Sequence, residues 1–218
     1  MQNIPPVTRL LLIANVVVYL LQQVAGGYLE ANFALWPIGA SRLLELDSGS
    51  TTPAGFEIWQ LVTYAFLHGG SLVRGNIGHI AFNMLALWMF GGRVENVLRS
   101  NRFAIYYFVC VIGAALAQLA VIHFFKPEDF YPTIGASGGV FGVLLAFAVM
   151  FPREKIYLYA IVPIPAAVMV VGYLVIEGYF GVTGTQEGVA HFAHLGGALA
   201  GFVLLQAWRA RALRRPDS

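Results

Sequence analysis

The sequence is poor in charged residues and in cysteine, and both deficits narrow what the chain can be. Charged residues make up 11% of its 218 residues, whereas ordinary globular domains carry about 25%. The 13 basic and 11 acidic residues leave a net charge of only +2, so no strongly basic face is available and we expect no nucleic-acid partner. The single cysteine, Cys110, excludes an internal disulfide framework and a thiolate metal cage.

Apolar residues, by contrast, are abundant. Hydrophobic residues make up 58% of the chain and its mean hydropathy is +0.71. Long apolar runs recur along the chain, and a helical membrane span needs about 20 predominantly apolar residues. We therefore predict an all-α polytopic membrane protein: one domain over residues 1–218, built as a bundle of six transmembrane helices. The predicted spans are residues 10–24, 79–92, 103–125, 135–151, 156–181 and 189–208.

Two segments differ from a regular transmembrane helix. The long first loop, residues 25–78, is too polar to cross a bilayer but contains Trp36, Trp59 and other aromatic residues, which suggests an interfacial or partly embedded element. In the fifth span, Pro163 and Pro165 cannot donate to a helical ladder, so regular helix is expected to start near Pro165.

The basic residues predict the orientation of the spans, because cytoplasmic segments carry an excess of Lys and Arg. With a cytoplasmic N-terminus and six alternating crossings, ten basic residues fall on the cytoplasmic side: Arg9, Arg93, Arg99, Arg102, Arg153, Lys155, Arg209, Arg211, Arg214 and Arg215. Three fall on the other side: Arg42, Arg74 and Lys126. We therefore expect both termini to be cytoplasmic.

Polar side chains inside spans are costly and by default mark function. Counts of 14 residues separate three polar side chains from the cytoplasmic boundaries of their spans: His79 from Arg93, Ser137 from Phe151 and His194 from Trp208. At 1.5 Å per helical residue this is about 21 Å above that end, or about 9 Å below the outer surface of a hydrocarbon core about 30 Å thick. Asn83 shares a helix face with His79 and lies about 6 Å deeper. Three spans therefore place polar groups at one level.

Small residues predict which of these spans touch. Gly138 and Gly142 form one small-xxx-small pair, and Gly197 and Gly201 form another; such pairs let membrane helices approach closely. A histidine brought beside Ser137 could remove its proton and activate it as a nucleophile. The start of a helix at Ser137 would also favour a developing oxyanion.

A metal site is the other interpretation of the histidines. His191 and His194 lie three residues apart and share a helix face. Against metal, we expect no carboxylate or cysteine at the matching depth, and the motif H-E-x-x-H is absent.

Taken together, the motifs resemble those of the rhomboid intramembrane serine proteases, of the compact bacterial six-span type. The matching segments are residues 79–83 (HIAFN), 135–138 (GASG) and 193–197 (AHLGG), with Gly201. Residues 57–59 (EIW) and 92–95 (GRVE) extend the resemblance over nearly the whole chain. The sequence departs from many relatives at Trp59-Gln60, where they have Trp-Arg, and in a longer segment at residues 69–78.

The resemblance implies a catalytic dyad of Ser137 and His194 without a third, acidic member. It implies an oxyanion hole formed by the Ser137 backbone N–H with the side chains of His79 and Asn83. Phe141 is expected to stack on His194. Supporting close packing is expected from Gly135, Gly138, Gly197 and Gly201. No metal and no organic cofactor is implied.

The implied function is an intramembrane serine endopeptidase that cleaves transmembrane protein substrates near the outer face of the lipid bilayer. The implied location is a bacterial inner membrane, with the active site open to the outer side. One alternative is a non-catalytic rhomboid-like protein that binds membrane clients, although such proteins typically lack the serine or the histidine. A small transporter is the other, although its polar groups should be spread through the depth of the bilayer. The sequence leaves the oligomeric state open.

Overall fold

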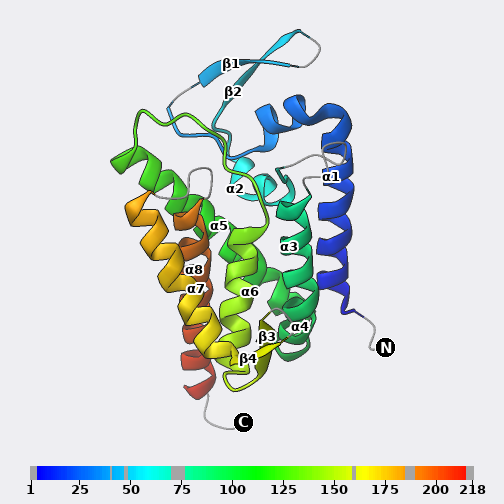
Figure 1. Ribbon diagram of the computed structural model, residues 1–218, viewed down its shortest axis with the longest axis vertical. Coiled ribbons are helices and arrows are strands. Elements are labelled where there is room, and N and C mark those ends of the chain that lie inside the picture. Colours follow the sequence, from blue (N-terminus) through cyan, green and yellow to red (C-terminus); the bar gives the residue numbers. More distant parts are fainter. Residues whose placement is uncertain are drawn as a thin grey trace.

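Helices form most of the structure. The computed structural model describes residues 4–39, 41–46, 49–69, 77–158, 161–184 and 190–214. The helices are α1 (Pro6–Phe33), α2 (Gln60–Thr63), α3 (Gly78–Ala86), α4 (Gly92–Leu98), α5 (Ser100–Phe125), α6 (Ser137–Met150), α7 (Ala166–Thr183) and α8 (His191–Leu213) (Figure 1). A short 3-10 turn, η1 (Tyr64–Phe66), follows α2, and a π-helical turn, η2 (Leu87–Gly91), joins α3 to α4.

Among the described residues, three helices have the length and hydropathy of a membrane span: α1, α5 and α7. The shorter α6 is also apolar. Helices cover the central part of five of the six predicted spans, and the fifth, residues 156–181, is helical only from Ala166 onwards. The start of α1 and the end of α8 lie at the same end of the bundle (Figure 1).

The prediction for the fifth span is partly wrong. Residues before Ala166 form an antiparallel hairpin, β3 (Lys155–Leu158) and β4 (Val162–Pro165), in which Ile156 pairs with Ile164. Prolines in β4 disfavour helix and suit a short edge strand. The expected start of regular helix near Pro165 is confirmed, because Pro165 is the N-cap of α7.

A second hairpin makes the all-α prediction incomplete. Strands β1 (Ser41–Glu45) and β2 (Thr51–Gly55) pair antiparallel within the first loop. In Figure 1 this hairpin projects beyond the helices, at the end opposite the start of α1. Both hairpins are short and peripheral, so the structure remains mostly helical.

Another part of the first loop packs onto the bundle through Gln60, the second residue of the Trp59-Gln60 pair. Its side chain is fully buried. The amide Nε2 donates to the carbonyl oxygens of Gly55 (2.9 Å) and Asn32 (3.3 Å), and Oε1 accepts the Trp36 N–H (3.2 Å). A neutral amide therefore anchors the loop to the end of α1. The segment noted above as longer, residues 69–78, lies mostly outside the residues that the structure describes.

Helix α6 lies in the middle of the bundle (Figure 1), and most of its residues are buried. Its glycines allow the closest contacts: a Cβ on Gly139 would lie 2.7 Å from the ring of Tyr107 on α5. A Cβ on Gly142 would overlap Cys110, which is also on α5. The absence of side chains at these positions thus lets α5 pack directly against the α6 backbone.

At the end of the bundle where α1 starts, Glu95 on α4 joins three helices. Its Oε1 accepts hydrogen bonds from the Val7 N–H (3.0 Å) and the Ser100 hydroxyl (2.7 Å). Its Oε2 accepts them from the Thr8 N–H (2.7 Å) and hydroxyl (2.8 Å). The carboxylate therefore caps the start of α1, where free N–H groups and the helix dipole favour negative charge.

These contacts make the stability of the fold depend on pH. Burial raises the pKa of Glu95, but hydrogen bonds from Ser100, Thr8 and Val7 outweigh burial and hold the pKa below its ordinary value of 4.5. A carboxyl group with a lowered pKa stabilises the folded state above its unfolded pKa. That stabilisation is lost as the pH falls through the lower pKa of the folded protein.

Glu95→Gln is expected to lower the free energy of unfolding by about 1–3 kcal/mol at neutral pH, because an amide replaces charged hydrogen bonds by weaker ones. Thermal unfolding in detergent micelles measures the effect. The Tm difference between the variant and the wild type should shrink as the pH falls below 4.5. A difference that stays constant over that range would contradict the assignment.

Candidate active site

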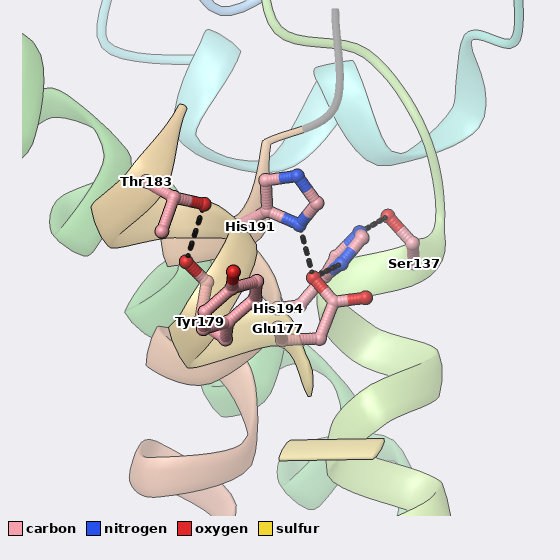
Figure 2. Close-up of polar contacts among 6 residues, drawn as sticks. All are labelled: Ser137, Glu177, Tyr179, Thr183, His191 and His194. Atoms are coloured by element: carbon pink, nitrogen blue, oxygen red, sulfur yellow. Dashed lines mark hydrogen bonds and ion pairs between the residues drawn. The ribbon is translucent and has the colours of Figure 1, made fainter. Parts of the chain in front are cut away.

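Ser137 and His194 are in hydrogen-bond contact. Ser137 is the first residue of α6, and His194 lies in the first turn of α8. His194 Nε2 and Ser137 Oγ are 2.8 Å apart (Figure 2). His194 is buried and Ser137 is half-buried. The proximity predicted from their common depth is confirmed.

Glycine packing brings the two helices this close. A Cβ on Gly197 of α8 would overlap the carbonyl oxygen of Gly138 on α6. One turn further, a Cβ on Gly201 would lie 2.8 Å from Cys110 Sγ on α5. The predicted contact between the small residues of the two helices is therefore confirmed, and α5 supports both.

The chain before Ser137 is held by two sets of backbone hydrogen bonds. Leu35 and Thr133 exchange N–H···O bonds of 3.0 and 2.9 Å. The Gly135 N–H donates to the Tyr64 carbonyl oxygen (3.0 Å). Gly135 has φ of +127°, a conformation that favours glycine over residues with a Cβ. The first loop and this turn together set where α6, and so Ser137, begins.

A cavity of about 510 Å³ opens beside these residues. The segment from Tyr131 to Gly135 forms part of its wall, and Ser137, His194 and His79 face it from α6, α8 and α3. The three polar residues that the sequence placed at one level thus line one cavity.

His79 presents a hydrogen-bond donor beside the serine. Its Nδ1 accepts the N–H of Gly69 (3.1 Å). Because one nitrogen of a neutral imidazole accepts and the other donates, Nε2 carries the proton. A Cβ on Gly135 would lie 2.7 Å from this Nε2, so the N–H lies next to the residue that leads into α6.

Asn83 is buried and is not among the residues that line the cavity. Its Nδ2 donates to the carbonyl oxygen of His79 (2.9 Å). An amide nitrogen carries two hydrogens, so this contact uses one of them and fixes Asn83 against the helix that presents His79.

Phe141 stacks on His194 as the resemblance implies. The ring centroids are 4.4 Å apart and the planes differ by 8°. Phe141 lies one turn after Ser137 on α6, so the helix that carries the hydroxyl also holds the ring of its partner.

Glu177 is a site residue that the sequence motifs did not predict. Its Oε2 lies 2.8 Å from His194 Nδ1 and 2.7 Å from His191 Nδ1 (Figure 2). The expectation that no carboxylate lies at the depth of His194 is therefore wrong. A signal was present, because Glu177 is an acidic residue within an apolar run. With Ala166 and Val170 it forms the one buried face of α7, so its carboxylate points into the bundle.

Glu177, His191 and His194 could also be considered as ligands of a metal, because their donor atoms lie within 4.8 Å of one another. However, ligand atoms about 2.0–2.1 Å from one tetrahedral ion are separated by about 3.3 Å. The nitrogen–oxygen distances of 2.7 and 2.8 Å are shorter and match direct hydrogen bonds. The donor set fits a hydrogen-bonded cluster better than a metal site.

Comparison with known proteins shows the family of the chain. A family model described as the Rhomboid domain matches residues 55–210. The chain belongs to the rhomboid family. It is therefore an integral membrane protein, in agreement with its apolar helices.

Several curated rhomboids are similar to the chain. Rhomboid protease GluP of Bacillus subtilis (strain 168) is 32% identical over 175 residues, which is 73% of this chain and 31% of GluP. Rhomboid protein 1, mitochondrial, of Saccharomyces cerevisiae is 32% identical over 149 residues, 64% of this chain and 40% of the relative. Rhomboid protease GlpG of Yersinia pseudotuberculosis is 26% identical over 209 residues, 94% of this chain and 63% of GlpG. The matches thus span less than two thirds of each relative.

Gly197→Ala is expected to separate the two helices of this rhomboid. The added Cβ meets a backbone carbonyl that cannot rotate away, and overpacking typically costs about 1–3 kcal/mol. Labelling by a serine-reactive fluorophosphonate should fall at least about 10-fold, an effect of about 1.4 kcal/mol, and Tm should fall with it. The matched control is Gly172→Ala on α7, where a Cβ meets nothing within 4 Å. Unchanged labelling of Gly197→Ala would show that this contact does not set the site.

Proposed function

We propose that the chain is an intramembrane serine endopeptidase, with Ser137 as the nucleophile and His194 as the general base. The observation that carries the proposal is the 2.8 Å contact between His194 Nε2 and Ser137 Oγ. It lies at a cavity of about 510 Å³ that could admit a peptide segment. The names of GluP and GlpG as rhomboid proteases support the same activity.

The chemistry follows from these groups. Ser137 Oγ attacks the carbonyl carbon of the scissile peptide bond while His194 Nε2 takes the hydroxyl proton. The tetrahedral intermediate collapses, the C–N bond breaks, and His194 gives the proton to the leaving amine. Water, with His194 again as base, hydrolyses the acyl-enzyme and regenerates the Ser137 hydroxyl.

The oxyanion formed in the attack would be bound by donors beside Ser137. The backbone N–H of Ser137 is at the start of α6, where N–H groups have no acceptor within the helix. The Nε2–H of His79 lies next to Gly135. Asn83 does not line the cavity, so it would add its second amide hydrogen only after its side chain turns towards Ser137. Loss of one oxyanion donor typically lowers kcat about 10²–10³-fold.

The proposed topology has six crossings, formed by α1, α3 with η2, α5, α6, α7 and α8. The excess of basic residues in alternate loops supports cytoplasmic termini. The site lies near the starts of α6 and α8, whereas the start of α1 and the end of α8 lie at the other end of the bundle (Figure 1). With this orientation the cavity opens towards the outer face of the membrane. The proposed membrane is a bacterial inner membrane.

The proposed substrates are membrane proteins with a transmembrane helix. Peptide hydrolysis needs water, which the hydrocarbon core lacks, and a cavity near the outer face can supply it. A substrate helix must unwind before its carbonyl reaches Ser137, since a helical carbonyl is already hydrogen-bonded. Neither metal nor organic cofactor has a role in this mechanism.

The alternatives use the same residues differently. A client-binding rhomboid would not need the hydrogen bond that joins Ser137 to His194. A transporter would need polar groups along a path, whereas here they gather at one end of α3, α6 and α8. Neither alternative is a protease, so both predict that the wild-type protein does not cleave a substrate and that changing Ser137 has no effect on cleavage.

Ser137→Ala and His194→Ala are each expected to abolish cleavage, with kcat falling at least about 10⁴-fold, since members of such a catalytic unit act together. The measurement is cleavage of a single-span substrate by purified protein in liposomes, with fluorophosphonate labelling as a second readout. Ser41→Ala, in the peripheral strand β1, is the control and should match the wild type. Cleavage by Ser137→Ala at the wild-type rate would disprove the proposal.

The position of the cut tests the topology separately. Ser137 is expected about 9 Å below the outer surface, so cleavage should fall near the outer end of the substrate span. Residues such as Gly or Pro after the bond should favour cleavage, because they weaken the substrate helix. Mass spectrometry of the two products locates the bond, and cuts near the cytoplasmic end would overturn the proposed orientation.

A further inference from the structure

The imidazole of His194 is held from both of its nitrogens. Nε2 contacts Ser137 Oγ and Nδ1 contacts Glu177 Oε2, each at 2.8 Å. The three side chains come from three different helices, α6, α8 and α7, and lie in a row (Figure 2). Glu177 and His194 are 9% and 8% exposed, so water screens their contact little.

The contact with the carboxylate selects one form of the histidine. An ionised carboxylate only accepts hydrogen bonds, so the proton of the neutral imidazole must be on Nδ1. Nε2 then has its lone pair directed at the Ser137 hydroxyl, as a general base requires. Without a carboxylate, the proton could move to Nε2 and block the base.

His191 holds the carboxylate in place. Its Nδ1 donates to the same oxygen, Glu177 Oε2, at 2.7 Å, and a carboxylate oxygen has lone pairs for two donors. Nε2 of His191 is buried and has no hydrogen-bond partner among the residues described. The Nδ1 contact is therefore the polar interaction that orients this ring.

We propose that Glu177 is a positioning residue that converts the Ser137–His194 pair into a Ser–His–Glu triad, with His191 orienting its carboxylate. This inference rests on the proposed function and deepens it. Glu177 touches no substrate atom; it fixes the tautomer and the orientation of His194 and stabilises the positive charge that the imidazole acquires in the transition state. It is the acidic member that a dyad mechanism lacks.

The decisive variant is Glu177→Gln, which keeps the shape but removes the charge and offers an N–H that would favour the wrong tautomer. The matched control is Glu95→Gln, the same change at a buried carboxylate with several hydrogen-bond donors at the other end of the bundle. Glu177→Gln should lower kcat at least about 10²-fold with little change in KM; removing the charge of a triad aspartate costs about 10⁴. Glu95→Gln should lower Tm and leave kcat near the wild-type value.

The tautomer of His194 separates positioning from a purely structural role. A side-chain amide can donate an N–H to Nδ1 of His194, whereas an ionised carboxylate only accepts. Glu177→Gln should therefore move the proton of neutral His194 from Nδ1 to Nε2, whereas a purely structural role of Glu177 would leave it on Nδ1.

A measurement on the wild type avoids any failure of the variant to fold. Nitrogen-15 NMR of histidine-labelled protein in micelles, assigned with His194→Ala, reports the tautomer of neutral His194. We expect the proton on Nδ1, and a proton on Nε2 would overturn the proposal. Removing metals with a chelator should leave wild-type kcat unchanged; a loss restored by zinc would overturn it in favour of an ion held by the two histidines and the carboxylate.

The remaining outcomes distinguish this inference from the proposed function. If Ser137→Ala is inactive but Glu177→Gln retains wild-type kcat, the triad is wrong and the protease assignment stands. If Glu177→Gln loses activity and Tm while the proton of neutral His194 stays on Nδ1, Glu177 is only structural and the triad is again wrong. If Ser137→Ala still cleaves, the proposed function itself fails.

Discussion

The site depends on one steric condition, which is that the backbones of α6 and α8 meet at Gly138 and Gly197. Any side chain at Gly197 would overlap the Gly138 carbonyl oxygen. Lipid provides no hydrophobic force between helices, so close packing of small residues is a main source of their association. The same contact places the first turns of both helices side by side, which brings Ser137 Oγ to 2.8 Å from His194 Nε2.

Two buried carboxylates sit on this helical framework, at its two ends and with different surroundings. Glu95 accepts hydrogen bonds from the start of α1 and from Ser100, and so ties the chain together near one end. Glu177 accepts two imidazole N–H groups beside the cavity. Each is satisfied by several donors, as a buried charge must be. Their difference lies in what the donors do: Glu95 holds backbone, and Glu177 holds a side chain that can carry a proton.

Much of the site could be predicted from the sequence because helix geometry is regular. A constant rise per residue makes depth a matter of counting, and residue numbers alone place His79, Ser137 and His194 at one level. The glycine spacings predict the helix contact for a similar reason. The peripheral hairpins were not predicted, since short strands in loops have no long period to reveal them. The apolar character of residues 155–165 favoured a span, although their prolines indicated a boundary.

The sequence by itself determined the membrane class, the small-residue faces and the common depth of three polar groups, because these follow from local composition and a fixed helical rise. Only the tertiary structure decided the lateral neighbours: that Gln60 anchors the first loop, that Asn83 bonds the His79 carbonyl, and that Glu177 reaches His194. Depth along a helix is set by counting residues. The direction in which a side chain points across a bundle depends on how each helix is rotated about its axis, and packing among all the helices sets that rotation.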